Sequence, residues 1–166
     1  QIYCASVQEA LDMVLWAYRM AEDPRVCLPA LVCLDGFMLS HTAENVIIPT
    51  QELVREFLPA KRFCKDSMLP EFDDKKIVNL QCPYDWKEHS RRKRALVSAM
   101  QSAHDAIPEI AGDWRRIFGE DYGNGFLRVS GDADAKTVVI SMGAIVGTIG
   151  EAFYKKPIKV IGLRFF

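Results

Sequence analysis

The feature that most constrains the fold is an apolar run, Val26 to Leu34, that stops abruptly at Asp35-Gly36. The run is interrupted only by Pro29, which predicts a strand that is covered on both faces or lies at a sheet edge near the proline. The polar run Ser40-His41-Thr42 follows the end of this strand. Since ligands bind at the carboxyl ends of strands in open α/β sheets, function is expected there.

A helix is predicted on the amino-terminal side of this strand. Ser6 and Glu9 have the spacing of a capping box, and apolar residues recur at helical spacing over 7–22. The pair Asp23-Pro24 ends the pattern, and a second short helix is expected over 50–58. A helix followed by a buried strand indicates a mostly parallel sheet.

The middle of the chain is predicted to be a linker followed by a helix. Residues 60–83 lack a sustained period, which suggests a connection between two packing units. The stretch 86–118 is helical in pattern, and Pro108 is expected to interrupt the helix and restart it. We interpret the basic run 91–94 as a solvated or interface-forming face of this helix.

The last part of the chain has the pattern of one βαβ unit. An apolar strand over 137–142, a helix over 146–154 and a strand over 158–163 should form a right-handed crossover. The predicted fold class is therefore α/β, with mostly parallel sheets, covering helices, and two partial α/β units joined by a helical linker. The predicted divisions are residues 1–59, 60–130 and 131–166.

Composition excludes several classes of partner. With 21 basic and 22 acidic side chains, the formal net charge of −1 offers no field that would attract nucleic acid. No apolar stretch is long enough to cross a membrane, and no signal peptide is evident, so we expect a cytoplasmic protein. Because the chain starts without Met and stops on a strand, we also expect a fragment of a longer polypeptide.

The five cysteines contain no C-x-x-C pair. This spacing argues against a disulfide framework, a zinc site or an iron–sulfur cluster held by this chain alone, so reduced thiols are expected. Cys27 and Cys33 are predicted to lie in the core. No metal ligand is assigned.

No catalytic residue can be assigned from the residues themselves. His41 is either a histidine bonded to backbone at a strand end or part of a ligand cleft or interface, and no nucleophile elbow accompanies it. Glu9, Glu22 and Glu44 each have a local explanation, so none is predicted to activate a cofactor. If Gly36 turns the chain with a positive φ, its replacement by alanine should be destabilising. The cleft or interface candidates are Asp35, Gly36, Phe37, Ser40, His41 and Thr42.

Two stretches together resemble a known enzyme family. The first combines a helix motif, Gln8, Glu9 and Asp12, with a strand that ends in Asp35-Gly36-Phe37 and Ser40-His41-Thr42. This combination resembles the α part of pyruvate:ferredoxin oxidoreductase and related 2-oxoacid:ferredoxin oxidoreductases, in the last third of the thiamine pyrimidine-binding domain. The second stretch, from Phe118 to Gly143, resembles the start of the transketolase carboxyl-terminal-like domain that follows in this family.

The resemblance implies a parent enzyme that oxidatively decarboxylates a 2-oxoacid, pyruvate by default, with coenzyme A. It would use thiamine diphosphate and Mg²⁺, and it would pass electrons through iron–sulfur clusters to ferredoxin. The family's cofactor-activating and substrate-binding residues lie upstream of Gln1, so other segments or subunits would hold these groups and this chain alone would hold none. Two alternatives are a transferase of the transketolase or deoxyxylulose-phosphate synthase type and a non-catalytic assembly module.

Overall fold

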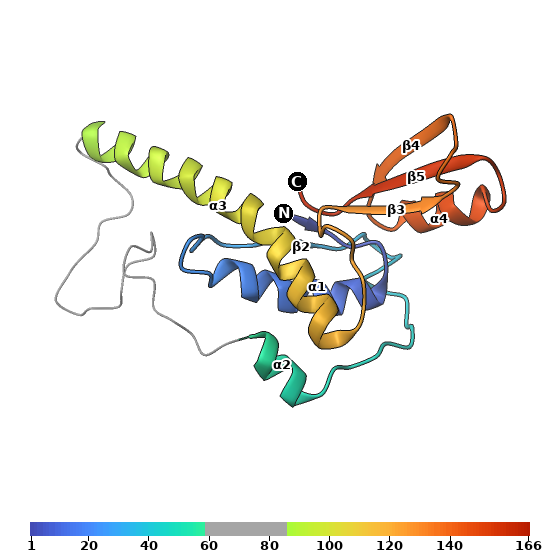
Figure 1. The fold of residues 1–166 in the computed structure, drawn as a ribbon, viewed down its shortest axis with the longest axis horizontal. Helices are drawn as coiled ribbons and strands as arrows, with labels where there is room; N and C mark the ends of the chain where they lie inside the picture. Colours follow the sequence, from blue (N-terminus) through green and yellow to red (C-terminus); the bar gives the residue numbers. More distant parts are fainter. Residues whose placement is uncertain (59–85) are drawn as a thin grey trace.

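The computed structural model describes residues 1–58 and 86–166, and Figure 1 shows an α/β arrangement, as predicted. The predicted linker, residues 60–83, lies outside the described residues. The elements, in chain order, are β1 (Ile2–Tyr3), α1 (Val7–Ala21), β2 (Val32–Cys33), α2 (Gln51–Phe57), α3 (Trp86–Phe118), β3 (Leu127–Gly131), β4 (Thr137–Met142), α4 (Ile145–Ala152) and β5 (Ile158–Leu163).

Helix α1 begins where the capping pair predicts. The Ser6 Oγ accepts the N–H of Glu9 at 3.1 Å, and the Glu9 carboxylate accepts the N–H of Ala5 at 2.6 Å. Two of the otherwise unpaired donors at the helix start are thereby satisfied. Local capping therefore fixes the start of this helix, and the predicted range 7–22 differs from the observed one by a single residue.

The first sheet is smaller than predicted. Only Val32–Cys33 of the apolar run form a strand, and they pair in parallel with β1. Pro29 has no N–H for a ladder, and Cys27 adopts φ 45°, a left-handed conformation that turns the chain before the strand. The prediction of a strand throughout Val26–Leu34 is therefore wrong for most of its length, although the parallel pairing is confirmed.

The cysteines do not all behave as reduced core thiols. Cys4 and Cys33 are free, and burial raises the pKa of the Cys4 thiol to about 12. Cys27 and Cys33 are half-buried and lie outside the core cluster, which corrects the prediction that both lie in the core. The raised pKa means that Cys4 stays protonated and unreactive at neutral pH.

The second sheet has the strand order β3-β5-β4. Strands β4 and β5 are parallel and joined through α4, which confirms the predicted βαβ unit. Helix α4 packs on β5, where the Val146 methyls lie 3.0 and 3.1 Å from the position that a Cβ on Gly162 would take. Strand β3 pairs antiparallel with β5 and was not predicted.

Helix α3 runs without a break through Pro108, which corrects the predicted interruption. The proline is exposed, whereas its neighbours Ala106, Ile107 and Ile110 are buried. We attribute the continuity to this packing, which offsets the hydrogen bond that proline cannot donate. The first half of α3 projects beyond α1 in Figure 1. No helix in the described part of the chain is long and apolar enough to cross a membrane.

An aromatic core joins the first three helices. Trp16 of α1 and Trp114 of α3 are each 1% exposed, with ring centroids 6.1 Å apart. Phe57 of α2 meets Trp114 edge-on at 5.1 Å, and Phe118 lies 4.0 Å from the same ring. Such pairs contribute more than their buried area alone, so Trp114 is the centre of this core.

Candidate functional site

The candidate residues predicted from the sequence form one exposed loop, 35–42, directly after β2. Phe37 is 77% exposed and has φ 67°. A bulky exposed residue in the left-handed region costs energy, which is typical of functional positions. Leu39 is buried with the core and anchors the middle of the loop.

Internal bonds give the loop a fixed shape. The Ser40 Oγ accepts the N–H of Phe37 at 3.1 Å and lies 2.7 Å from His41 Nδ1. The carbonyl of Phe37 accepts from the His41 N–H at 3.1 Å and from the Thr42 hydroxyl at 3.3 Å. The rings of Phe37 and His41 are 5.1 Å apart. The loop therefore presents an aromatic ring and an imidazole together to its surroundings.

Gly36 does not turn the chain with a positive φ, because that conformation falls on Phe37 instead. A Cβ on Gly36 would meet nothing within 4 Å. The condition on which Gly36→Ala was expected to be destabilising, a positive φ at Gly36, is therefore not met. We predict that Gly36→Ala changes the free energy of unfolding by less than about 0.5 kcal/mol, since nothing clashes and the site is on the surface. Urea denaturation of the variant would contradict this if it showed a loss above about 1 kcal/mol.

Asp35 points away from this aromatic tip. Its Oδ2 accepts the N–H of Ala144, at the start of α4, at 2.5 Å. Asp35 is half-buried, and this bond joins two segments that are 109 positions apart in the sequence. The six candidates thus have different surroundings, with Asp35 bonded to the second sheet unit and Phe37, Ser40, His41 and Thr42 exposed.

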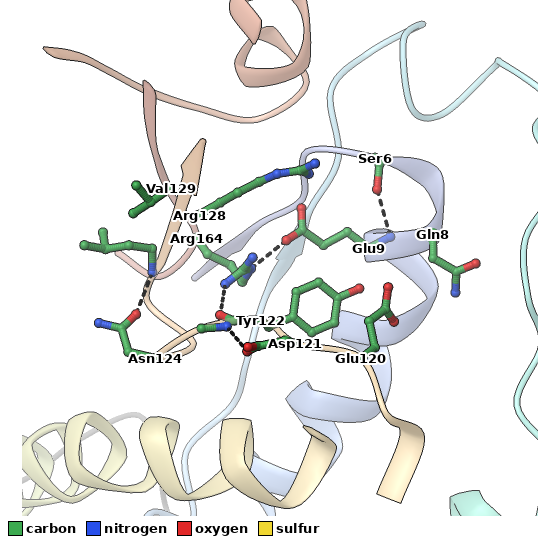
Figure 2. A pocket seen from close by; sticks show the side chains of 12 residues that line it. Ser6, Gln8, Glu9, Glu120, Asp121, Tyr122, Asn124, Arg128, Val129 and Arg164 are labelled. Atoms are coloured by element: carbon green, nitrogen blue, oxygen red, sulfur yellow. Dashed lines mark hydrogen bonds and ion pairs between the residues drawn. The ribbon is translucent and has the colours of Figure 1, made fainter. Parts of the chain in front are cut away.

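A cavity of about 580 Å³ lies elsewhere, between the start of α1 and the segment that leads into β3. Figure 2 shows its lining, which contains no residue of the 35–42 loop. Its charged members come from three distant segments, so tertiary folding assembles it. They are Glu9, Glu120, Asp121, Arg128 and Arg164.

A buried ion pair forms the floor of this cavity. The Arg164 Nε donates to Glu9 Oε1 at 2.6 Å, and both side chains are 3% exposed. The Arg164 Nη1 also donates to the carbonyls of Gly125, at 2.7 Å, and Tyr122, at 3.2 Å. Figure 2 shows the guanidinium between the acid and the Tyr122 main chain. The local explanation given to Glu9 from the sequence was incomplete, because its carboxylate also neutralises a buried arginine.

Asp12 extends this polar network. Its carboxylate accepts from the Tyr122 hydroxyl at 2.6 Å and from the Gln8 amide at 3.0 Å. Gln8 in turn pairs with both backbone groups of Ile47, accepting its N–H at 2.7 Å and donating to its carbonyl at 3.1 Å. Burial raises the pKa of Asp12, and burial together with the nearby Asp12 charge raises the pKa of Glu120.

The buried acids Glu9 and Asp12 both have partners within the chain, Arg164 for Glu9 and the Tyr122 hydroxyl and Gln8 amide for Asp12. Residues 1–58 and 86–166 contain no group of three side chains placed to hold a metal ion. The helix motif Gln8, Glu9 and Asp12 makes all of the contacts described above within the chain.

Sequence reasoning missed Arg164 and Tyr122. A signal existed for the first, because Arg164 is a lone charge in the apolar run 161–166 and such a charge needs a partner. No comparable signal pointed to Tyr122.

The comparisons with known proteins agree with the motifs. The model of the family described as "Pyruvate flavodoxin/ferredoxin oxidoreductase, thiamine diP-bdg" matches residues 1–111. The chain is 36% identical over 166 residues to pyruvate synthase subunit PorA of Methanocaldococcus jannaschii, covering 98% of this chain and 41% of that protein. It is 35% identical over 153 residues to ketoisovalerate oxidoreductase subunit VorA of Pyrococcus abyssi, covering 92% and 37%.

A third relative is the PorA subunit of Methanothermobacter thermautotrophicus, which is 37% identical over 151 residues, covering 91% of this chain and 38% of that protein. The chain thus spans about two fifths of the length of these relatives. The family match extends from the first strand into α3 and includes the whole 35–42 loop. The chain therefore belongs to the pyruvate flavodoxin/ferredoxin oxidoreductase family, in its thiamine diphosphate-binding part.

Proposed function

We propose that this chain is part of the alpha-type subunit of a thiamine diphosphate-dependent 2-oxoacid:ferredoxin oxidoreductase. The enzyme would decarboxylate pyruvate oxidatively with coenzyme A and pass electrons through iron–sulfur clusters to ferredoxin. The observation that carries this proposal is the family match over residues 1–111. The relatives named as pyruvate synthase and ketoisovalerate oxidoreductase subunits support a 2-oxoacid as substrate.

Within that enzyme, we assign this chain a supporting role. Thiamine diphosphate and Mg²⁺ would bind mainly to other segments or subunits, because the buried acids described above are already engaged. The clusters would also bind elsewhere, because the sequence has no C-x-x-C pair to supply their thiolates. The exposed pair Phe37 and His41 would contact another segment or subunit of the same oxidoreductase. We also retain, as a proposal, the division into units 1–59, 60–130 and 131–166.

The test of this function is an assay of the intact parent complex. Pyruvate oxidation that depends on coenzyme A and reduces ferredoxin or a viologen dye would support the proposal, with the branched 2-oxoacid 2-oxoisovalerate as the alternative substrate to compare. Transfer of two-carbon units between sugar phosphates, with no reduced acceptor, would instead identify a transketolase-type transferase.

His41 gives a second prediction. We expect His41→Ala in the parent complex to lower the turnover number several-fold while it changes the free energy of unfolding by less than about 0.5 kcal/mol, because an exposed loop residue is held little by packing. His104→Ala is the control, since His104 has a 73% exposed side chain and lies on α3. Full activity of the His41 variant would leave the loop with a structural role only.

A further inference from the structure

One side chain connects the 35–42 loop to the second sheet unit. The N-cap residue of helix α4 (Ile145–Ala152) is Ala144, whose side chain cannot accept a hydrogen bond and so provides no cap. The Asp35 carboxylate, 109 positions away in the sequence, accepts the Ala144 N–H at 2.5 Å and so satisfies one of the unpaired donors at the helix start. Its negative charge also lies at the positive end of the helix dipole, where an anion is stabilised.

The lack of a side chain at Gly143 leaves room for this carboxylate. Gly143 has φ 72°, and a Cβ at this position would lie 2.9 Å from both carboxylate oxygens of Asp35. Two other glycines of the same segment, Gly147 and Gly150, would meet nothing within 4 Å. The steric need for glycine is therefore specific to the position that faces Asp35.

The bonds inside the loop cannot by themselves orient it. They join Phe37, Ser40, His41 and Thr42 to one another, so they set its shape but not its direction relative to β4 and α4. Buried Leu39 ties the middle of the loop to the core of the first unit, and the Asp35–Ala144 bond at the base of the loop supplies the reference to the second sheet unit. Loss of the Asp35–Ala144 bond would therefore let the exposed Phe37 and His41 rings move together.

We propose that Asp35 is a positioning residue, whose contact with Gly143 and Ala144 fixes the direction in which the Phe37–His41 tip is presented to its partner segment or subunit. We call this contact of Asp35 with Gly143 and Ala144 the latch, because it joins the segment after β2 to the start of α4. This inference deepens the proposed function and rests on it for the effect on turnover, but the effect on loop mobility does not depend on the reaction.

Hydrogen exchange measured by mass spectrometry on the intact parent complex tests the latch. Asp35→Ala and Gly143→Ala are each expected to speed exchange in residues 37–41 and at Ala144 by at least about tenfold. Asp35→Asn keeps an oxygen that accepts the N–H and should limit the increase to less than about threefold. Gly147→Ala is the matched control, because Gly147 lies in α4, four residues after Gly143, and a Cβ there would meet nothing within 4 Å. This variant should leave exchange in the loop unchanged.

Pyruvate turnover separates positioning from a general loss of structure. If Asp35 acts through the Phe37–His41 tip, the turnover lost in Asp35→Ala and in His41→Ala should not be additive. The turnover number of the double variant should then lie within about twofold of that of the slower single variant. Asp35→Asn should recover most of the turnover lost in Asp35→Ala.

Three results would overturn the latch. They are unchanged exchange of residues 37–41 in Asp35→Ala, an equal effect of Gly147→Ala, and losses of turnover that multiply in the double variant. If Asp35→Ala fails to assemble, Gly143→Ala and Asp35→Asn decide the question by exchange. If the wild-type complex oxidises no 2-oxoacid, the proposed function fails, whereas the exchange data still decide whether Asp35 holds the loop.

Discussion

Replacing Arg164 by methionine is expected to lower the free energy of unfolding by about 3–5 kcal/mol, because it leaves the Glu9 carboxylate buried without its counter-charge. Both side chains are 3% exposed, so water cannot take the place of the guanidinium without opening the structure. The carbonyls of Tyr122 and Gly125 lose their donor in the same substitution. Urea denaturation of the intact subunit, followed by circular dichroism, measures the loss.

Two variants make this prediction specific. Arg116→Met removes an arginine from an ion pair with Glu56 whose side chains are 60% and 52% exposed, and it should cost no more than about 1 kcal/mol. The double variant Glu9→Gln with Arg164→Met should be more stable than Arg164→Met alone, because it removes the orphaned charge. A loss below about 1 kcal/mol in Arg164→Met would mean that the pair contributes like a surface ion pair.

Trp114→Ala is the second large effect, with an expected loss of about 3–5 kcal/mol. The ring is 1% exposed and contacts aromatic residues of α1, α2 and α3, so its removal leaves a cavity that several elements would have to close. Thermal or urea unfolding of the intact subunit measures it.

Trp86→Ala is the matched control for this core variant. Trp86 is on the same helix but is 73% exposed, so we expect its loss to change the free energy of unfolding by less than about 0.5 kcal/mol. Equal effects of the two substitutions would contradict the assignment of Trp114 to the centre of the core.

The parts of the fold that could be predicted depend on neighbours in the sequence. The start of α1 follows from Ser6 and Glu9, and the bounds of β4 and β5 follow from short apolar runs next to turns. The errors arise where long-range packing decides the outcome. Pro108 is tolerated because α3 is buried on both sides of it, and β3 is a strand because it has β5 to pair with, although its own pattern is weak.

The candidate site likewise has a part that could be predicted from the sequence and a part that depends on the folded chain. Position after a strand was enough to single out the 35–42 loop, because strand ends are where polar side chains gather. The partners of these residues could not be inferred, since Asp35 meets Ala144 and Glu9 meets Arg164 only after the chain has folded. The positive φ falls on Phe37 rather than Gly36, and the bonds that close the loop to the Phe37 carbonyl could not be read from the sequence either.

The 155-residue separation between Glu9 and Arg164 has a consequence for biosynthesis. At about 5–20 residues per second, a ribosome needs roughly 8–30 s to add the arginine after the acid. During that interval, α1 can form but cannot bury its amino-terminal turn, because an unpaired carboxylate resists leaving water. Helix α1 therefore waits for the segment after β5, and this unit completes its folding only once Arg164 has emerged.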